Sequence, residues 1–142
     1  MSDILVTPRL FLRRWLPSDL PLFALMNADP EVMEFYPALL NVQESADFIA
    51  RIEKKFEQNG FGLWALEIRD TGVFAGYTGL NIPDFTASFT PCIEIGWRLA
   101  HAQWGKGYAS EAARMVLAWA FEQKRLPQIL SWTFSSFQVL PY

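Results

Sequence analysis

The sequence is poor in the residues that build disulfides and metal centres. Among its 142 residues are one cysteine, Cys92, and one histidine, His101. A single cysteine excludes a disulfide within the chain, and the Cys and His spacings typical of zinc sites are absent. The longest uninterrupted apolar run, residues 115–121, is far shorter than the roughly 20 residues that span a bilayer. The first residues lack the basic flank and apolar stretch of a signal peptide, so we expect a soluble, cytoplasmic protein.

Charged residues of either sign are also scarce. Twelve Lys and Arg stand against 15 Asp and Glu, which gives a net charge of −3. This balance argues against a nucleic-acid partner held by bulk charge, but it allows a small polyanion held by a few local groups. Hydrophobic residues make up 51% of the chain, enough for one sizeable core. No repeat or linker divides the sequence, so we expect a single domain over residues 1–142.

Hydrophobic periodicity predicts a mixture of strands and helices. Alternating apolar residues indicate strands over residues 10–15, 62–69, 73–80, 92–100 and 128–134. Helical spacing indicates a short helix after Pro17 and longer helices over residues 43–58 and 108–124. The order is strand, two helices, three strands, helix and strand. This order is typical of an α/β or α+β domain.

A glycine-rich loop separates the strand over residues 92–100 from the helix that follows it. The loop contains Gly105, Lys106 and Gly107. Free backbone amides at a helix start favour an anion, and glycines let a pyrophosphate approach the backbone. Lys106 would add a charge-assisted contact. The same glycines are compatible with a tight turn that binds nothing. The Walker motif does not fit, because the lysine lies between the glycines, and Ser110 breaks the dinucleotide fingerprint.

The strand before this loop carries a second candidate feature. Glu94, Gly96 and Arg98 share one face, and the opposite face carries Ile93, Ile95, Trp97 and Leu99. A glycine within a strand often marks a close ligand approach. A partly desolvated carboxylate beside it is suited to act as a general base. The alternative is a solvent-facing Glu94 and Arg98, which lie about 13 Å apart at the usual strand rise.

Four segments together resemble the GNAT superfamily of acyl-CoA-dependent N-acetyltransferases. Two of them are Glu-Ile-Gly-Trp-Arg-Leu at residues 94–99 and Trp-Gly-Lys-Gly-Tyr-Ala-Ser-Glu-Ala at residues 104–112. Residues 7–14 and 74–80 are similar to the opening and third strands of the branch that acetylates the N-termini of ribosomal proteins. The resemblance extends from about residue 7 to residue 134. It implies a GNAT fold, in which helices flank a mixed, mostly antiparallel central sheet.

The resemblance also implies acetyl-CoA as the acetyl donor, bound between the strands at residues 92–100 and 128–134. Backbone groups of residues 97–99 would hold the pantetheine arm, and amides of residues 105–109 would hold the pyrophosphate. Trp104 stands where the family's loop pattern has glutamine or arginine. The implied cofactor-binding residues are Trp97, Arg98, Leu99, Trp104, Gly105, Lys106, Gly107, Tyr108 and Ala109. An amine would attack the thioester directly, with Glu94 in the position of the base and no metal.

The C-terminal residues depart from the family's pattern. The family continues after the strand at residues 128–134 with a helix and two closing strands, whereas this sequence reads Ser131 to Tyr142. We therefore expect an incomplete domain, without the last helix, the closing strands or the late general acid. Its strand at residues 128–134 would expose an unpaired apolar edge, which favours homo-oligomers such as a dimer.

The expected function is acetyl transfer to a primary amine, either a protein N-terminus or a small molecule. A CoA-binding or interaction module without turnover and a nonfunctional fragment are the alternatives. We expect His101 at the surface and Cys92 as a small buried side chain. Residues 27–41 and 83–91 would border the acceptor pocket and contribute the aromatic side chains Phe35, Tyr36, Phe85 and Phe89.

Overall fold

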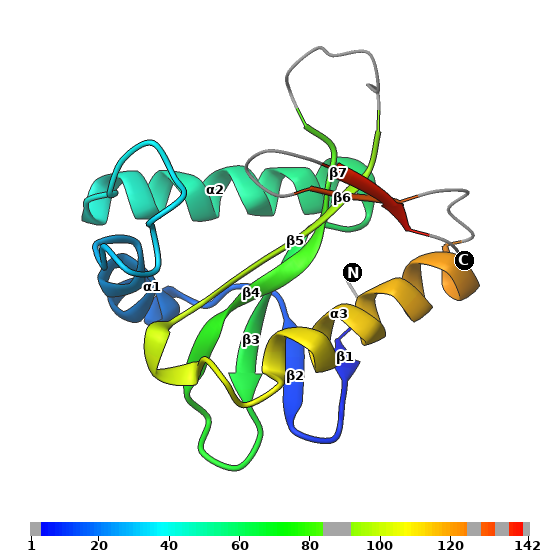
Figure 1. Cartoon of the computed structure of the whole chain (residues 1–142), viewed down its shortest axis with the longest axis horizontal. Coiled ribbons are helices and arrows are strands. Elements are labelled where there is room, and N and C mark those ends of the chain that lie inside the picture. The colour runs from blue at the N-terminus through cyan, green and yellow to red at the C-terminus, as the bar shows by residue number, and fades with distance from the viewer. Residues whose placement is uncertain (1–3, 84–91, 125–128, 133–136, 141–142) are drawn as a thin grey trace.

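The fold is built on one sheet whose strands follow one another in chain order (Figure 1). The computed structural model describes residues 4–83, 92–124, 129–132 and 137–140. Neighbouring strands are antiparallel except β5 and β6, which are parallel. The strands are β1 (Leu5–Val6), β2 (Leu10–Arg13), β3 (Leu63–Ile68), β4 (Phe74–Asn81), β5 (Glu94–Leu99), β6 (Ile129–Trp132) and β7 (Phe137–Leu140). The predicted mixed, mostly antiparallel α/β fold is confirmed.

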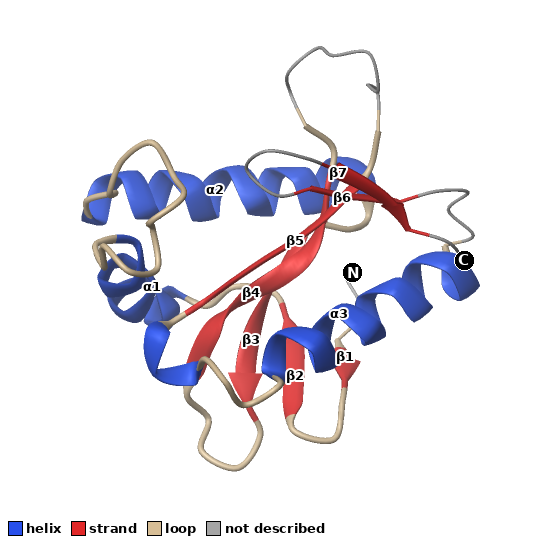
Figure 2. Cartoon of the chain, viewed as in Figure 1, coloured by secondary structure: helices blue, strands red, loops and turns tan. Residues whose placement is uncertain are grey.

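Helices cover both faces of this sheet (Figure 2). On one face lie α1 (Leu20–Asn27), which follows the short turn η1 (Pro17–Asp19), and α2 (Val42–Asn59). On the other face lies α3 (Tyr108–Ala118), which follows the turn η2 (His101–Gln103) and continues as the π-helical turn η3 (Trp119–Gln123). Among the described residues, no helix combines the length and apolarity that a membrane span requires.

Aromatic side chains form much of the core on both faces of the sheet. On the α1 side, the ring of Phe23 lies 4.9 Å from that of Trp15 and 6.2 Å from that of Phe74. On the α3 side, the indoles of Trp64 and Trp119 meet edge to face at 5.1 Å. Edge-to-face pairs of this kind add to the free energy gained by burying the rings. Aromatic pairs therefore help to hold the helices to the sheet on both faces, and Phe56 of α2 also packs edge to face on Trp64, with 5.5 Å between the ring centres.

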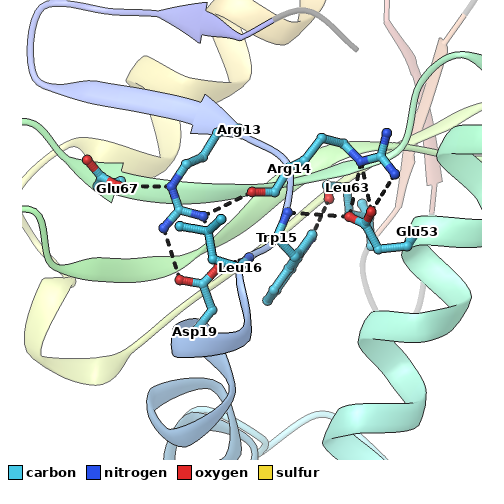
Figure 3. Close-up of polar contacts among 8 residues, drawn as sticks. All are labelled: Arg13, Arg14, Trp15, Leu16, Asp19, Glu53, Leu63 and Glu67. Atoms are coloured by element: carbon cyan, nitrogen blue, oxygen red, sulfur yellow. Dashed lines mark hydrogen bonds and ion pairs between the residues drawn. The ribbon is translucent and has the colours of Figure 1, made fainter. Parts of the chain in front are cut away.

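An ion pair secures the point where β2 leads into α1 (Figure 3). Both terminal nitrogens of Arg13 donate to the Asp19 carboxylate at 2.9 Å, and Nε donates to Glu67 at 2.9 Å. The backbone amide of Leu16 donates to the same Asp19 carboxylate at 2.8 Å. The Asp19 side chain is only 3% exposed. The start of α1 is thus tied to β2 and β3 by charges largely removed from water.

Two strands and one helix end differ from the sequence prediction. The periodicity missed β1 and β7, and the helix predicted over residues 108–124 changes to a π-helical turn at Trp119. β7 pairs with β6 in antiparallel register, from Ile129 opposite Leu140 to Trp132 opposite Phe137. The prediction of an unpaired edge at the strand over residues 128–134 was therefore wrong. The outer edge on this side of the described sheet belongs to β7.

The two sides of β5 are paired very differently. Six residue pairs join β5 to β4, whereas the described register with β6 consists of Glu94 opposite Leu130. The close approach of β4 requires glycine at position 76, where a Cβ atom would lie 2.2 Å from the carbonyl oxygen of Arg98. Beyond Glu94, β5 continues to Leu99 with no described strand on its β6 side. An open main-chain edge therefore leads towards the glycine loop.

Candidate active site

The loop after β5 prepares the first turn of α3 as an anion site. Gly105 and Gly107 have φ angles of 74° and 82°, left-handed values that favour glycine. Gly107 is the N-cap of α3, and the first helical bond runs from the Glu111 amide to the Gly107 carbonyl at 3.0 Å. The amides of residues 108–110 come before this bond, so the helix offers them no carbonyl four residues earlier as an acceptor. These amides and the helix dipole are suited to bind a phosphate.

A pocket of about 420 Å³ opens beside this loop. The end of β5, the glycine loop, the start of α3 and the segment between α1 and α2 form its walls. Its lining residues are Val32, Tyr36, Trp97, Arg98, Leu99, Gln103, Trp104, Gly105, Gly107, Tyr108, Ala109 and Ser110. Eight of the nine predicted cofactor residues line it. Lys106 does not, and its ammonium group instead lies 3.4 Å from Gln103 Oε1.

Four lining residues were not among the predicted cofactor residues. Gln103 and Ser110 flank the glycine loop on either side, so their place in the sequence could have indicated them. Val32 and Tyr36 come from the segment between α1 and α2, which was expected to border the acceptor pocket. Tyr36 lines this pocket, whereas Phe35 is exposed and does not line it. The place of Tyr36 beside the acceptor stays a prediction. The two aromatic residues predicted from the second segment, Phe85 and Phe89, lie outside the described residues.

Trp97 differs in exposure from the apolar residues that share its face of β5. Ile95 and Leu99 are buried, whereas Trp97 is 46% exposed and lines the pocket. The Ala100 amide donates to the Ala75 carbonyl of β4. Because the direction of main-chain groups alternates along a strand, Trp97 and Leu99 present theirs to the open edge. The Leu99 carbonyl accepts a hydrogen bond from the Trp104 indole at 3.0 Å, which anchors the loop to this edge.

The start of α3 is also held by the first hairpin of the chain. Glu111 accepts hydrogen bonds from the Thr7 hydroxyl, from the Arg9 amide at 2.9 Å and from Arg9 Nε at 2.7 Å. The Arg9 guanidinium also lies over the ring of Tyr108, 4.5 Å from its centre. Partial burial opposes ionisation of Glu111, but these hydrogen bonds outweigh it and lower the pKa. The carboxylate in the first turn of α3 is therefore already paired with a cation.

Arg98 is buried rather than solvent-facing, because α1 and α2 cover its side of the sheet. It is 6% exposed, and its Nη1 donates to Asn27 Oδ1 at 2.7 Å. Its guanidinium carbon lies 4.2 Å from the ring centre of Tyr36 and 5.2 Å from that of Tyr77. Burial raises the pKa of Tyr77, although the nearby Arg98 charge opposes this rise. The Tyr77 phenol is therefore neutral and supplies no countercharge.

Glu94 lies on the same face of β5 but at its other end. Its carboxylate accepts a hydrogen bond from Asn81 Nδ2 at 2.8 Å, and Asn81 Oδ1 accepts one from Lys55 Nζ at 2.7 Å. Burial raises the pKa of Glu94, opposed by the Asn81 hydrogen bond and the Lys55 charge. Glu94 does not line the pocket. Between Glu94 and Arg98, a Cβ atom added to Gly96 would meet no described atom within 4 Å, so the described residues leave space beside Gly96.

The remaining candidates from the sequence have local roles. His101 is at the surface, as predicted, and its Nε2 lies 3.0 Å from a carboxylate oxygen of Glu31. Cys92 is half-buried, and burial together with the nearby Glu94 carboxylate raises the pKa of its thiol. Within the described ranges, no group of three or more His, Cys, Asp or Glu side chains is arranged to hold a metal ion.

Comparisons with known proteins agree with this geometry. The acetyltransferase (GNAT) domain family matches residues 9–136. The uncharacterized protein YkkB of Bacillus subtilis (strain 168) is 34% identical over 122 residues, which cover 85% of this chain and 70% of YkkB. The crystal structure of an acetyltransferase from Agrobacterium tumefaciens str. C58 superposes with a TM-score of 0.79 at 27% identity, covering 92% of this chain and 74% of that one.

A third comparison concerns the fold alone. RimL, a ribosomal L7/L12 alpha-N-protein acetyltransferase solved in complex with coenzyme A, superposes with a TM-score of 0.72 at 12% identity. The match covers 91% of this chain and 73% of RimL. Since the family match includes β2 to β6, the glycine loop and α3, the resemblance noted in the sequence is confirmed. The chain belongs to the GNAT family of acetyltransferases.

Proposed function

We propose that the chain transfers an acetyl group from acetyl-CoA to a primary amine, either a protein N-terminus or a small molecule. The observation that carries this proposal is the pocket at the start of α3, which joins the glycine loop to the open edge of β5. The loop amides would hold the pyrophosphate, and the outward main-chain groups of Trp97 and Leu99 would pair with the pantetheine arm. Because acetyl-CoA is the donor, we place this activity in the cytoplasm.

The reaction replaces a C–S bond with a C–N bond, removes a proton from the nitrogen and adds one to the sulfur. Acetyl-CoA supplies the thioester. The amine nitrogen attacks its carbonyl carbon, so that a C–N bond forms and the C–S bond breaks. The nitrogen loses a proton, and the departing thiolate gains one. A backbone amide on the open edge of β5 would stabilise the negative charge on the carbonyl oxygen. Glu94 would accept the amine proton, directly or through water, across the space that the described residues leave beside Gly96.

Replacing Gly105 with valine is expected to weaken acetyl-CoA binding at least tenfold. A φ of 74° costs a β-branched residue about 1–3 kcal/mol, so the loop would move to relieve this strain. A tenfold loss corresponds to about 1.4 kcal/mol, which lies within that range. Isothermal titration calorimetry of the whole chain with acetyl-CoA measures the change.

Gly72 provides the matched control for this substitution. It lies in the β3–β4 turn with a φ of 73°, and a Cβ atom there, as at Gly105, would meet no described atom within 4 Å. Gly72→Val should therefore lower the free energy of unfolding by a similar amount and leave acetyl-CoA affinity unchanged. An unchanged affinity of Gly105→Val for acetyl-CoA would contradict the proposal that the loop amides hold the pyrophosphate. Tight binding without acetylation of any amine would instead favour a CoA-binding module.

A homo-oligomer remains part of the proposal, but through a different strand from the one first expected. Within the described residues, β7 pairs with β6 alone and leaves its other main-chain edge available to a second copy. We expect light scattering after size-exclusion chromatography to give twice the chain mass of 16.3 kDa. A monomer at high protein concentration would contradict this prediction.

A further inference from the structure

We infer that Arg98 binds a carboxylate of the acceptor, so that the acceptor is an amino acid or peptide whose amine and carboxylate enter the pocket together. This inference rests on the proposed acetyl transfer. It begins from an arginine that is 6% exposed and lines the pocket.

The charge on Arg98 is not balanced by the described part of the chain. Arginine has five N–H donors, and the described contacts of Arg98 use one of them, the Nη1 bond to Asn27 at 2.7 Å. Its Nε is buried and has no hydrogen-bond partner among the described residues. No described carboxylate lies within 4.0 Å of the guanidinium. Arg13, by contrast, is half-buried and pairs with both Asp19 and Glu67.

Burying a cation with no carboxylate beside it is costly, and the described surroundings of Arg98 offset only part of that cost. The faces of Tyr36, Tyr77 and Phe48 lie 4.2, 5.2 and 5.5 Å from the guanidinium carbon. Cation–π contacts of this kind stabilise the charge, but they leave the N–H groups unsatisfied. Low-dielectric walls also strengthen the attraction for an incoming anion. Such a site favours an anionic ligand over an empty pocket.

The hydrogen bonds of Arg98 leave one edge of the guanidinium for this ligand. Asn27 is fully buried and accepts from Nη1, while its own Nδ2 donates to Ser45 Oγ at 3.0 Å, which fixes the amide's orientation. Nε and Nη2 remain, and together they form the planar fork that matches the two oxygens of a carboxylate. The ring of Tyr36, which is 41% exposed, lies over the guanidinium and would turn aside as the acceptor enters.

The position of Arg98 assigns this anion to the acceptor rather than to acetyl-CoA. The proposed pyrophosphate site is at the start of α3, on one face of the sheet. The side-chain partners of Arg98 come from α1, from α2 and from the segment between them, on the opposite face. Tyr36 belongs to this second group and also lines the pocket. The pocket therefore connects two separate anion sites, one on each side of β5.

The decisive experiment compares acceptors that differ only in the carboxylate. Acetylation of the common L-amino acids by the whole chain is measured beside acetylation of the corresponding primary amides, with mass spectrometry of the products. We expect at least one amino acid to have a KM at least tenfold below that of its amide. Arg98→Met should remove this preference, and Arg98→Lys should restore part of it. The acetyl-CoA contact implied for residue 98 is a main-chain one, so calorimetry should still detect acetyl-CoA binding by Arg98→Met.

The possible failures are distinguishable. Equal KM values for an amino acid and its amide in the wild-type chain would overturn the inference and leave the acetyl transfer standing. An Arg98→Met variant that loses acetyl-CoA affinity would assign the anion to the donor's phosphates and also overturn it. If no amine is acetylated, the proposed function fails. The inference is then tested by the melting temperature, which an amino acid should raise more than its amide does. If Arg98→Met does not fold, the inference is tested on the wild-type chain alone, by comparing an amino acid with its amide in KM and in melting temperature.

Discussion

Replacing Asp19 with alanine is expected to lower the free energy of unfolding by about 3–5 kcal/mol, the usual range for breaking a buried ion pair. The Arg13 and Asp19 side chains are 13% and 3% exposed, and their two hydrogen bonds both measure 2.9 Å (Figure 3). Alanine would leave the guanidinium with the Glu67 carboxylate and the Arg14 carbonyl as acceptors, and the Leu16 amide without its acceptor. Urea denaturation followed by tryptophan fluorescence measures the loss.

Glu53 provides the control for Asp19. Its carboxylate also pairs with an arginine, Arg14, but the two side chains are 32% and 28% exposed. A more exposed pair contributes less, so Glu53→Ala should cost no more than about 1 kcal/mol. Equal losses in the two variants would show that burial does not set the strength of these pairs.

Replacing Glu94 with glutamine is expected to lower turnover about 100-fold if Glu94 is the general base. Wild-type turnover should rise with pH as Glu94 loses its proton, and burial places that rise above the usual glutamate pKa. The glutamine side chain does not ionise in this pH range, so turnover of the variant should lack this rise. Initial rates measured from about pH 5 to about pH 9 test both effects. Glu57→Gln, which changes an exposed carboxylate on α2, is the matched control and should leave turnover unchanged.

The stability of Glu94→Gln separates a catalytic role from a structural one. A raised pKa means that the folded protein holds this proton more tightly than the unfolded chain does. The carboxyl group therefore makes the fold less stable as the pH rises from the unfolded pKa through the folded one. Glutamine removes this decline, so the variant should be at least as stable as the wild type near neutral pH. Unchanged turnover would remove Glu94 from the mechanism.

Local patterns in the sequence predicted most of the fold. The alternation in residues 62–69 and 73–80 corresponds to β3 and β4, and the helical spacing in residues 43–58 corresponds to α2. β1 was missed because a strand of two residues has no measurable period. The change to a π-helical turn at Trp119 was missed because the apolar spacing continues through it.

Site residues could be predicted where they lie close together in the sequence, but not where segments far apart in the sequence come into contact. The glycine loop and the helix start lie next to each other in the sequence, so the residues of the pyrophosphate site could be found there. Asn27 and Arg98 are 71 residues apart, and no pattern in either segment indicates their contact. The exposure of Trp97 could not be predicted for a related reason. Alternation says which residues share a face, but not whether a helix or a pocket covers that face.

The Asp19 ion pair and the Arg98 site stand at opposite ends of one short helix. α1 has 8 residues and is about 12 Å long, with Asp19 just before its start and Asn27 as its last residue. A tilt of about 5° at the first end would displace the other end by about 1 Å at this length. Such a displacement is enough to break the 2.7 Å bond from Arg98 to Asn27. The angle of α1 thus connects a salt bridge outside the pocket to the arginine proposed to select the acceptor.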